Sequence, residues 1–270
     1  MPGNWDTEGM LSGPPSTPVE LPDALVALIG PHDHEVVWRN ELGGLTVRVG
    51  APLGVHVKWS PASSDVDLGD ERIRLEWARA YTPVPEVLDA GADEDGSWLI
   101  TRTIDARNAV SKEWSSDPEA ASVALGRGLR AMHDAMPTAT CPFEWSAARR
   151  LTAIRQRGAK AALGFGAAMT PDHDPTASID DLGETPEVDL VVCHGDACAP
   201  NTLLDECGAW VAHVDLGQLG VGDRWADLAV MAWSTEWNYG PGWVPLVYES
   251  YGVPVDEEKV RYYRLLWTLE

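Results

Sequence analysis

The stretch that decides the fold reads VVCHGDACAPNTLL and spans residues 191–204. Its apolar lead-in is typical of a buried strand and runs directly into a His-Gly-Asp sequence that ends at Asp196. Asn201 follows at the fifth position after Asp196, and a second acid, Asp215, comes after another apolar run and before Leu and Gly. The pattern therefore places two carboxylates and one side-chain amide behind strand-like segments.

This spacing matches the catalytic loop of protein kinases, H-R-D-x-x-x-x-N, which is followed further on by D-F-G. Phosphoryl transfer needs a carboxylate that faces the acceptor hydroxyl, and oxygen ligands for the Mg²⁺ ions that neutralise the phosphates. We therefore assign Asp196 to the hydroxyl, and Asn201 and Asp215 to the metal. A His-Gly turn beside a solvated Asp would explain residues 194–196, but not the placement of Asn201 and Asp215 as well.

The chain before this stretch predicts a small antiparallel sheet. Strand-like runs over residues 35–39, 45–49 and 55–59 are separated by Gly- and Pro-containing turns, as in a meander. An acidic helix is expected over residues 67–80, and residues 87–101 predict a hairpin.

One lysine of this sheet has a predicted role. The third strand ends in Val55-His56-Val57-Lys58, which resembles the V-A-I-K strand whose Lys contacts the phosphates of ATP. Kinases pair that Lys with a Glu of the next helix. We expect Lys58 to pair with Glu71, with Glu76 as the second choice.

The predicted fold class is α+β, a two-lobed protein-kinase-like fold. The N-terminal lobe would be a small antiparallel sheet with one helix, and the C-terminal lobe would be larger and mainly helical. The expected organisation is a flexible leader over 1–20, a nucleotide-binding lobe over 21–101, a hinge over 102–105, and a catalytic and substrate-binding lobe over 106–270.

Several helices of the C-terminal lobe carry start signals. Asp117 followed by Pro118 predicts a capped helix whose apolar face includes Met132, and we interpret the next residue, His133, as a core or capping residue. Residues 145–163 predict a basic helix. Asp227 is expected to open an apolar helix and to bond back to the catalytic-loop backbone.

Composition narrows the possible partners. The formal net charge of -22 disfavours nucleic acid and anionic membranes and would attract a polycation. No apolar run approaches the length of a membrane span, and the N-terminus lacks the features of a signal peptide. The four cysteines match no zinc pattern, so we expect free thiols in the cytoplasm. The 13 Trp against 2 Phe have no evident cause in the sequence.

Three segments together carry a family resemblance. They are HGDACAPN (194–201), VDLGQLGVGDRWADLA (214–229) and VRYYRLLW (260–267), and they resemble the aminoglycoside phosphotransferases, bacterial antibiotic kinases with a protein-kinase-like fold. The likeness covers roughly residues 35–270. It implies ATP-dependent phosphorylation of an aminoglycoside hydroxyl with Mg²⁺, and hence a cationic small-molecule substrate.

The resemblance also implies roles for individual residues. Asp196 would be the catalytic base, Asn201 and Asp215 the metal ligands, Lys58 and Glu71 the phosphate-binding pair, Arg102 and Ile104 the backbone contacts to adenine, and His194 and Asp227 the structural support of the loop.

Departures from the family pattern leave its branch open. Gln218 stands where an Arg is common, and the chain ends in Leu-Trp-Thr-Leu-Glu instead of the acidic-aromatic tail of kanamycin-type enzymes. Glu236 and Asn238 look more like the streptomycin-type branch, to which we lean slightly. We expect Glu236, Glu270 and some acids of residues 172–189 to line an acidic cleft for the amines of the substrate.

Other functions remain as alternatives. The chain could phosphorylate another small cationic or hydroxylated metabolite, as choline and homoserine kinases do. It could also hydrolyse phosphoesters with a metal pair, or bind nucleotide without catalysis. The sequence is compatible with a monomer or a homodimer.

Overall fold

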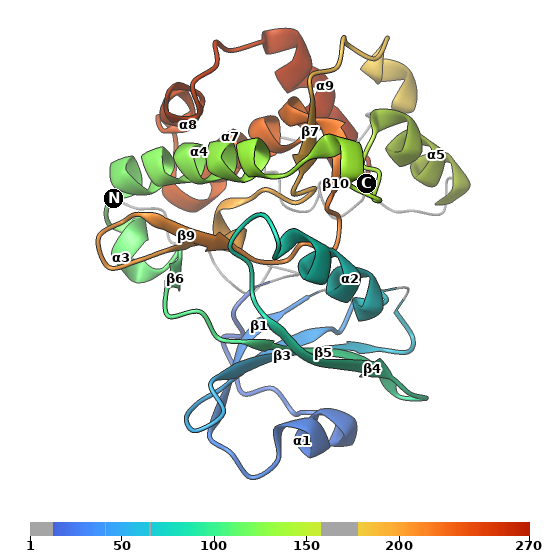
Figure 1. Ribbon diagram of the computed structural model, residues 1–270, viewed down its shortest axis with the longest axis vertical. Coiled ribbons are helices and arrows are strands. Elements are labelled where there is room, and N and C mark those ends of the chain that lie inside the picture. The colour runs from blue at the N-terminus through green and yellow to red at the C-terminus, as the bar shows by residue number, and fades with distance from the viewer. Residues whose placement is uncertain (1–12, 41, 65, 158–177) are drawn as a thin grey trace. The chain divides into compact units, whose positions relative to one another are not determined.

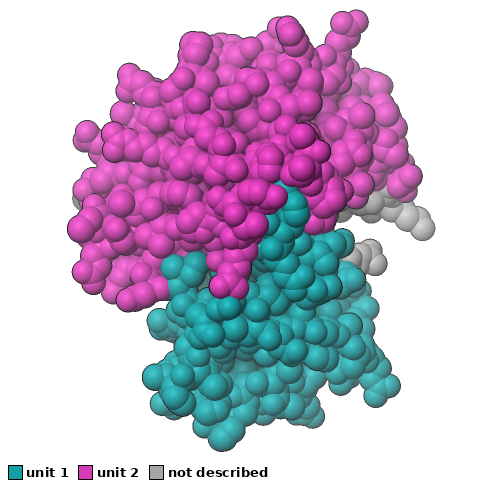
Figure 2. All heavy atoms as spheres, viewed as in Figure 1, with its two compact units in different colours: residues 1–77, 85–104 teal, residues 78–84, 105–270 magenta. Residues whose placement is uncertain are grey.

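The structure is a computed structural model that describes residues 13–40, 42–64, 66–157 and 178–270 (Figure 1). The chain forms two compact units, coloured separately in Figure 2. Unit 1 comprises residues 1–77 and 85–104, and unit 2 comprises residues 78–84 and 105–270. Much of the predicted leader lies outside the described residues, and the boundaries predicted for the leader, lobes and hinge stay predictions.

Unit 1 is built on a five-stranded antiparallel sheet with the order β1-β2-β3-β5-β4, in which the predicted meander and the predicted hairpin are joined by the pairing of β3 with β5. Its strands are β1 (His34–Arg39), β2 (Leu45–Val49), β3 (Val55–Pro61), β4 (Val87–Ala92) and β5 (Gly96–Arg102). Helix α1 (Asp23–Ile29) packs on one face of this sheet, and helix α2 (Leu68–Ala78) lies over the other (Figure 1).

Strand β3 explains how this sheet presents Lys58. Val55, Val57 and Trp59 are buried in the core that includes Leu25 of α1. Because successive side chains of a strand point to opposite faces, Lys58 leaves that core and reaches the face covered by α2.

Unit 2 is mainly helical, and its helices pack around one core. They are α3 (Lys112–Ser115), α4 (Pro118–Ala135), α5 (Ala147–Arg157), α7 (Arg224–Tyr239), α8 (Val244–Tyr251) and α9 (Glu257–Thr268). Helix α4 begins as predicted, because the Asp117 side chain accepts a hydrogen bond from the N–H of Ala120 at 3.2 Å. Residues 158–163 of the predicted basic helix lie outside the described residues. Within the described ranges, no helix is long and apolar enough to cross a membrane.

The start of α7 corrects one expectation. The helix begins at Arg224 rather than at Asp227, because the side chain of Asp223 accepts a hydrogen bond from the N–H of Trp225 at 3.0 Å and caps it. Asp227 therefore lies inside the first turn, where its side chain is fully buried.

Two small sheets in unit 2 hold the decisive stretch. Strand β7 (Leu190–Cys193) pairs with β10 (Gly220–Asp223), and β8 (Thr202–Leu204) lies between β6 (Arg107–Asn108) and β9 (Trp210–His213). Cys193 is paired with Gly220, and Thr202 with His213. Paired residues of antiparallel strands lie about 5 Å apart. The loops 194–201 and 214–219 are therefore joined at both ends and must run side by side.

Candidate active site

The loop 194–201 fixes the geometry of its own acid. The side-chain amide of Asn201 donates to the backbone oxygen and to Oδ2 of Asp196, each at 2.9 Å. The other carboxylate oxygen, Oδ1, is buried without a hydrogen-bond partner among the residues that the structure describes. Burial raises the pKa of Asp196, and the hydrogen bond from Asn201 opposes this shift only in part. Asp196 is thus a rigid carboxylate with one oxygen unused.

The second loop is bonded directly to the first. His194 donates from Nε2 to the backbone oxygen of Val214 at 2.9 Å, and the N–H of Val214 donates to the backbone oxygen of Asn201 at 3.0 Å. Gly195 has φ of +89°, and a Cβ there would lie 2.5 Å from Cβ of Gln218. Only glycine fits both that backbone and that contact. The predicted metal ligands Asn201 and Asp215 therefore lie on adjoining loops.

Asp215 itself has an unusual backbone. Its φ is +63°, and it is the only non-glycine residue with positive φ in the described part of the chain. This left-handed conformation is uncommon for residues with a Cβ and is concentrated at functional sites. The preceding residue, Val214, is fixed by its hydrogen bond to Asn201, and this helps to maintain the backbone conformation of Asp215. The backbone conformation of Asp215 thus supports a functional role independently of the sequence motif.

Asp227 accepts hydrogen bonds from the backbone of the catalytic loop. Its Oδ2 accepts the N–H of His194 at 2.6 Å, and its Oδ1 accepts the N–H of Gly195 at 2.9 Å, as expected from the sequence. Oδ2 also accepts a hydrogen bond from Nε2 of His133 at 2.9 Å. Burial alone would raise the pKa of Asp227, but the bond and charge of His133 hold the pKa below its ordinary value.

Sequence reasoning missed part of this support. His133 was interpreted as a core or capping residue, but it joins Asp227 to the hydroxyl of Tyr251 at 2.8 Å. Ser234 accepts the N–H of Ala199 at 3.0 Å through its Oγ. Ser234 lies seven residues after Asp227, which is two helical turns, so the same helix face could have been inferred from spacing. Nothing in the sequence marks the partner of His133.

His194 carries its proton on Nε2. Its Nδ1 accepts the N–H of Asp196 at 3.2 Å, while Nε2 faces the oxygen of Val214. A ring nitrogen that accepts an N–H carries no proton, so Nδ1 acts as the acceptor and Nε2 as the donor. Both ring nitrogens are thus engaged by the backbone, which suits the predicted supporting role.

In unit 1, Lys58 meets Glu71. The ammonium Nζ lies 2.8 Å and 2.9 Å from the two carboxylate oxygens of Glu71, a residue that is 7% exposed. Glu76, the second choice, instead pairs with Arg72 on the exposed side of α2. The expected pairing of Lys58 with Glu71 is confirmed, and its role toward a nucleotide stays a prediction.

Arg102 and Ile104, the predicted adenine contacts, differ in which of their backbone groups could bond to adenine. The N–H of Arg102 already donates to the backbone oxygen of Glu86 at 2.9 Å, and its guanidinium pairs with the Glu86 carboxylate. Only the carbonyl of Arg102 is thus left to contact adenine. Ile104 is half-buried, and its backbone groups form no backbone hydrogen bond within the described ranges.

The predicted substrate acids are spread over the ends of α7 and α9. Glu236 is half-buried in the last turns of α7, where the amide of Asn238 donates to the oxygen of Ser234 at 2.8 Å. The carboxylate of Glu270, by contrast, is held by Arg150 in a two-point ion pair at 2.7 and 2.8 Å. Arg150 is 2% exposed, so this carboxylate neutralises a buried cation and is a poor choice for a substrate amine.

The acidic segment 172–189 is used internally where it is described. The side chain of Asp181 accepts hydrogen bonds from the backbone and side chain of Ser178. Asp189 forms an ion pair with Arg224. Asp172 and Asp174 lie outside the described residues. The expectation that acids of this segment line a substrate cleft is therefore not supported for Asp181 and Asp189.

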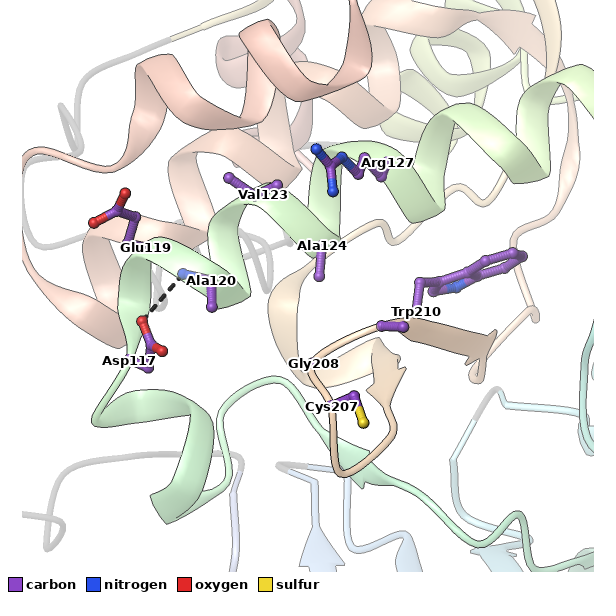
Figure 3. Close-up of a pocket in the computed structure, with 10 residues that line it drawn as sticks. Asp117, Glu119, Ala120, Val123, Ala124, Arg127, Cys207, Gly208 and Trp210 are labelled. Atoms are coloured by element: carbon purple, nitrogen blue, oxygen red, sulfur yellow. Dashed lines mark hydrogen bonds between the residues drawn. The ribbon is translucent and has the colours of Figure 1, made fainter.

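One cavity of unit 2 lies away from these loops. It measures about 570 Å³ and lies between the start of α4 and the turn that joins β8 to β9 (Figure 3). Its lining includes Ala120 and Ala124 on the helix, and Cys207 and Gly208 on the turn. None of the predicted site residues lines it.

Comparisons with known proteins point to one family. A family model described as "Phosphotransferase enzyme family" matches residues 32–263. An aminoglycoside 3′-phosphotransferase of Streptomyces fradiae is 36% identical over 221 residues, or 77% of this chain and 81% of that protein. A streptomycin 3″-kinase of Streptomyces griseus is 31% identical over 242 residues, or 82% and 86%. The solved structure of a 3″-type aminoglycoside phosphotransferase of Streptomyces rimosus has a TM-score of 0.75 and 25% identity, and covers 91% of this chain and 95% of that chain.

Proposed function

Because the chain belongs to the phosphotransferase enzyme family, we propose that it is an ATP-dependent kinase that phosphorylates a hydroxyl group of an aminoglycoside. The predicted resemblance to the aminoglycoside phosphotransferases is confirmed by the family model and by the named relatives. The observation that carries the proposal is the bonded pair of loops, in which Asn201 orients the Asp196 carboxylate and Val214 ties Asp215 beside it. The named relatives are a 3′-phosphotransferase and a 3″-kinase, so hydroxyls at the 3′ and 3″ positions are the two candidate acceptors.

Asp196 serves as the base in this proposal. Its Oδ2 is held by Asn201, and we assign Oδ1, which has no hydrogen-bond partner among the described residues, to accept the proton of the substrate hydroxyl. The raised pKa makes the carboxylate a stronger proton acceptor than an exposed aspartate. The oxygen of the acceptor, freed of its proton, attacks the γ-phosphorus as the bond to ADP breaks.

Asn201 and Asp215 suit a magnesium ion. The Asn201 amide nitrogen is engaged by Asp196, which turns its Oδ1 oxygen away as a candidate ligand, and Asp215 adds a carboxylate. Mg²⁺ prefers oxygen ligands and is usually held by one or two protein groups together with phosphates and water. When bound, the metal neutralises charge on the phosphates.

Lys58 is the proposed phosphate contact of unit 1. We assign its ammonium to the α- and β-phosphates, with Glu71 fixing its direction. The carbonyl of Arg102 and the backbone of Ile104 remain the proposed contacts to adenine. Glu236 and Asn238 are the proposed contacts to the acceptor, whose ammonium groups are complementary to the acidic chain.

The function can be tested directly. The protein is incubated with Mg-ATP and each of kanamycin, neomycin and streptomycin, with choline and homoserine as alternative acceptors. Mass spectrometry should find one added phosphate on at least one aminoglycoside and none on choline or homoserine. Phosphate release that needs no acceptor would instead favour a hydrolase. ATP binding without any turnover would favour a non-catalytic module.

Glu71→Gln is expected to raise the KM for ATP by about tenfold or more, since it removes a charge-assisted bond that fixes Lys58. Glu76→Gln makes the same change on the same helix, but at an exposed pair with Arg72. It should leave this KM within about twofold. Initial rates with varied ATP measure both. Equal effects of the two variants would contradict the assignment of Glu71.

A further inference from the structure

Three tryptophans form a cluster where α7 and α9 end. The ring centres of Trp233 and Trp237 on α7 lie 5.0 Å apart, and Trp237 stacks on Trp267 of α9 at 5.3 Å with an angle of 21° between the ring planes. Trp233 and Trp267 meet edge to face at 6.2 Å. We call these three residues the aromatic cluster. It accounts for part of the tryptophan excess that the composition left unexplained.

The aromatic cluster flanks the residue of α7 that contacts the catalytic loop. Ser234 accepts the N–H of Ala199 in that loop. Trp237 follows Ser234 by three residues, which on a helix means about 60° of rotation and about 4.5 Å of rise. Glu236 and Asn238, the proposed contacts to the acceptor, are its neighbours in the chain. The cluster thus lies beside the segment that would face an acceptor.

The chemistry of the aromatic cluster suits a cation. The guanidinium of Arg264 lies 5.1 Å from the centre of the Trp233 ring, so one cation is already held against an indole face. Trp233 and Trp237 are half-buried, and Nε1 of Trp237 is buried with no hydrogen-bond partner in the described part of the chain. A buried indole N–H usually finds an acceptor. A hydroxyl oxygen of a ligand could serve as that acceptor.

We propose that the aromatic cluster is a subsite for one ring of the acceptor, a ring that carries an ammonium or guanidinium group. This inference rests on the proposed function and adds the residues that recognise the substrate. The apolar C–H face of the ring lies on an indole, its cation faces the π system, and the neighbouring Glu236 carboxylate contributes charge. Trp237 is the central residue, because it contacts both other members.

The test compares Trp237→Leu, Trp237→Phe and a control, Trp98→Leu. Trp98 is also half-buried, but it lies on β5 in unit 1 and donates to Asp89. With kanamycin and streptomycin as acceptors, Trp237→Leu should raise the acceptor KM by about tenfold or more, with the KM for ATP within about twofold. Trp237→Phe keeps a ring without the N–H and should fall between. Trp98→Leu should leave the acceptor KM unchanged.

A second measurement does not depend on activity. The indole N–H resonance of Trp237, identified by its absence in Trp237→Phe, should shift when kanamycin or streptomycin is titrated without nucleotide. An unchanged acceptor KM in a folded Trp237→Leu variant, or an unmoved Trp237 resonance at saturating acceptor, would overturn the subsite. If the native protein phosphorylates no aminoglycoside, the proposed function fails. If it does so and Trp237→Leu behaves identically, only the subsite fails.

Discussion

Asp196→Asn is expected to lower kcat by on the order of 10²–10⁴-fold, the usual contribution of a general base, while ATP binding stays within about twofold. The amide has nearly the same shape as the carboxylate but cannot take the proton of the acceptor. The new amide would also lie against the Asn201 side chain, whose nitrogen donates to Oδ2 of Asp196 in the native protein. Single-turnover phosphorylation of an aminoglycoside measures the chemical step, and calorimetry with ATP measures nucleotide binding.

Asp205→Asn supplies the matched control. Asp205 lies in the turn after β8 and accepts the N–H groups of Cys207 and Ala209, so the same substitution tests for general damage to this region. Turnover of that variant should match the native protein. Retention of more than a tenth of the native kcat in Asp196→Asn would remove Asp196 from the role of base. Loss of ATP binding together with turnover would show a structural role instead.

Asp227→Asn is expected to lower the free energy of unfolding by about 3–5 kcal/mol. Three donors converge on this buried carboxylate, namely the N–H groups of His194 and Gly195 and the ring of His133. An asparagine offers one oxygen and adds an NH₂ group of its own, so donors are left unpaired in the core. Thermal unfolding should show a drop in Tm on the order of 10 °C.

The control for this variant is Asp134→Asn. Asp134 pairs with Arg130 on an exposed face of α4, where the two side chains are 59% and 42% exposed. Its loss should cost less than about 1 kcal/mol. Equal losses in Asp134→Asn and Asp227→Asn would show that the bonds beneath the catalytic loop contribute little.

The effect of Asp227 should depend on pH in a defined direction. Its folded-state pKa lies below the ordinary value of 3.8, so the carboxylate stabilises the folded protein above that pH. This stability is lost as the pH falls through the folded pKa. The difference in unfolding free energy between native protein and Asp227→Asn should therefore be constant near neutrality and should shrink below about pH 4. Denaturant titrations at neutral and acid pH measure it.

The sequence predicted what local spacing controls. The alternation in β3 places Lys58 opposite the buried valines, and one helix later Glu71 lies within reach of it. The acid and the amide of loop 194–201 are close in the chain, so their pairing follows from a short turn. Cap signals such as Asp117 also predicted a helix start correctly, because the hydrogen bond that they make is local.

Contacts between distant segments escaped prediction. Glu270 is far in sequence from Arg150, and nothing in either segment shows that the two are paired or that Arg150 is buried. His133 meets Asp227 and Tyr251 only because α4, α7 and α8 pack together. The start of α7 was misplaced because Asp223 and Asp227 are both plausible caps, and the end of β10 decides between them. Such choices are made by tertiary packing, which a single sequence does not report.

The two strand pairs that enclose the active loops also restrict how the gene can vary in length. With Cys193 fixed to Gly220 and Thr202 fixed to His213, an inserted codon in either loop would force one ladder out of register and turn its side chains to the wrong face. The turn between β8 and β9 lies outside these two loops, and its residues 206 and 207 are exposed. Tags, linkers and natural insertions should therefore be tolerated at that turn and rejected a few residues to either side.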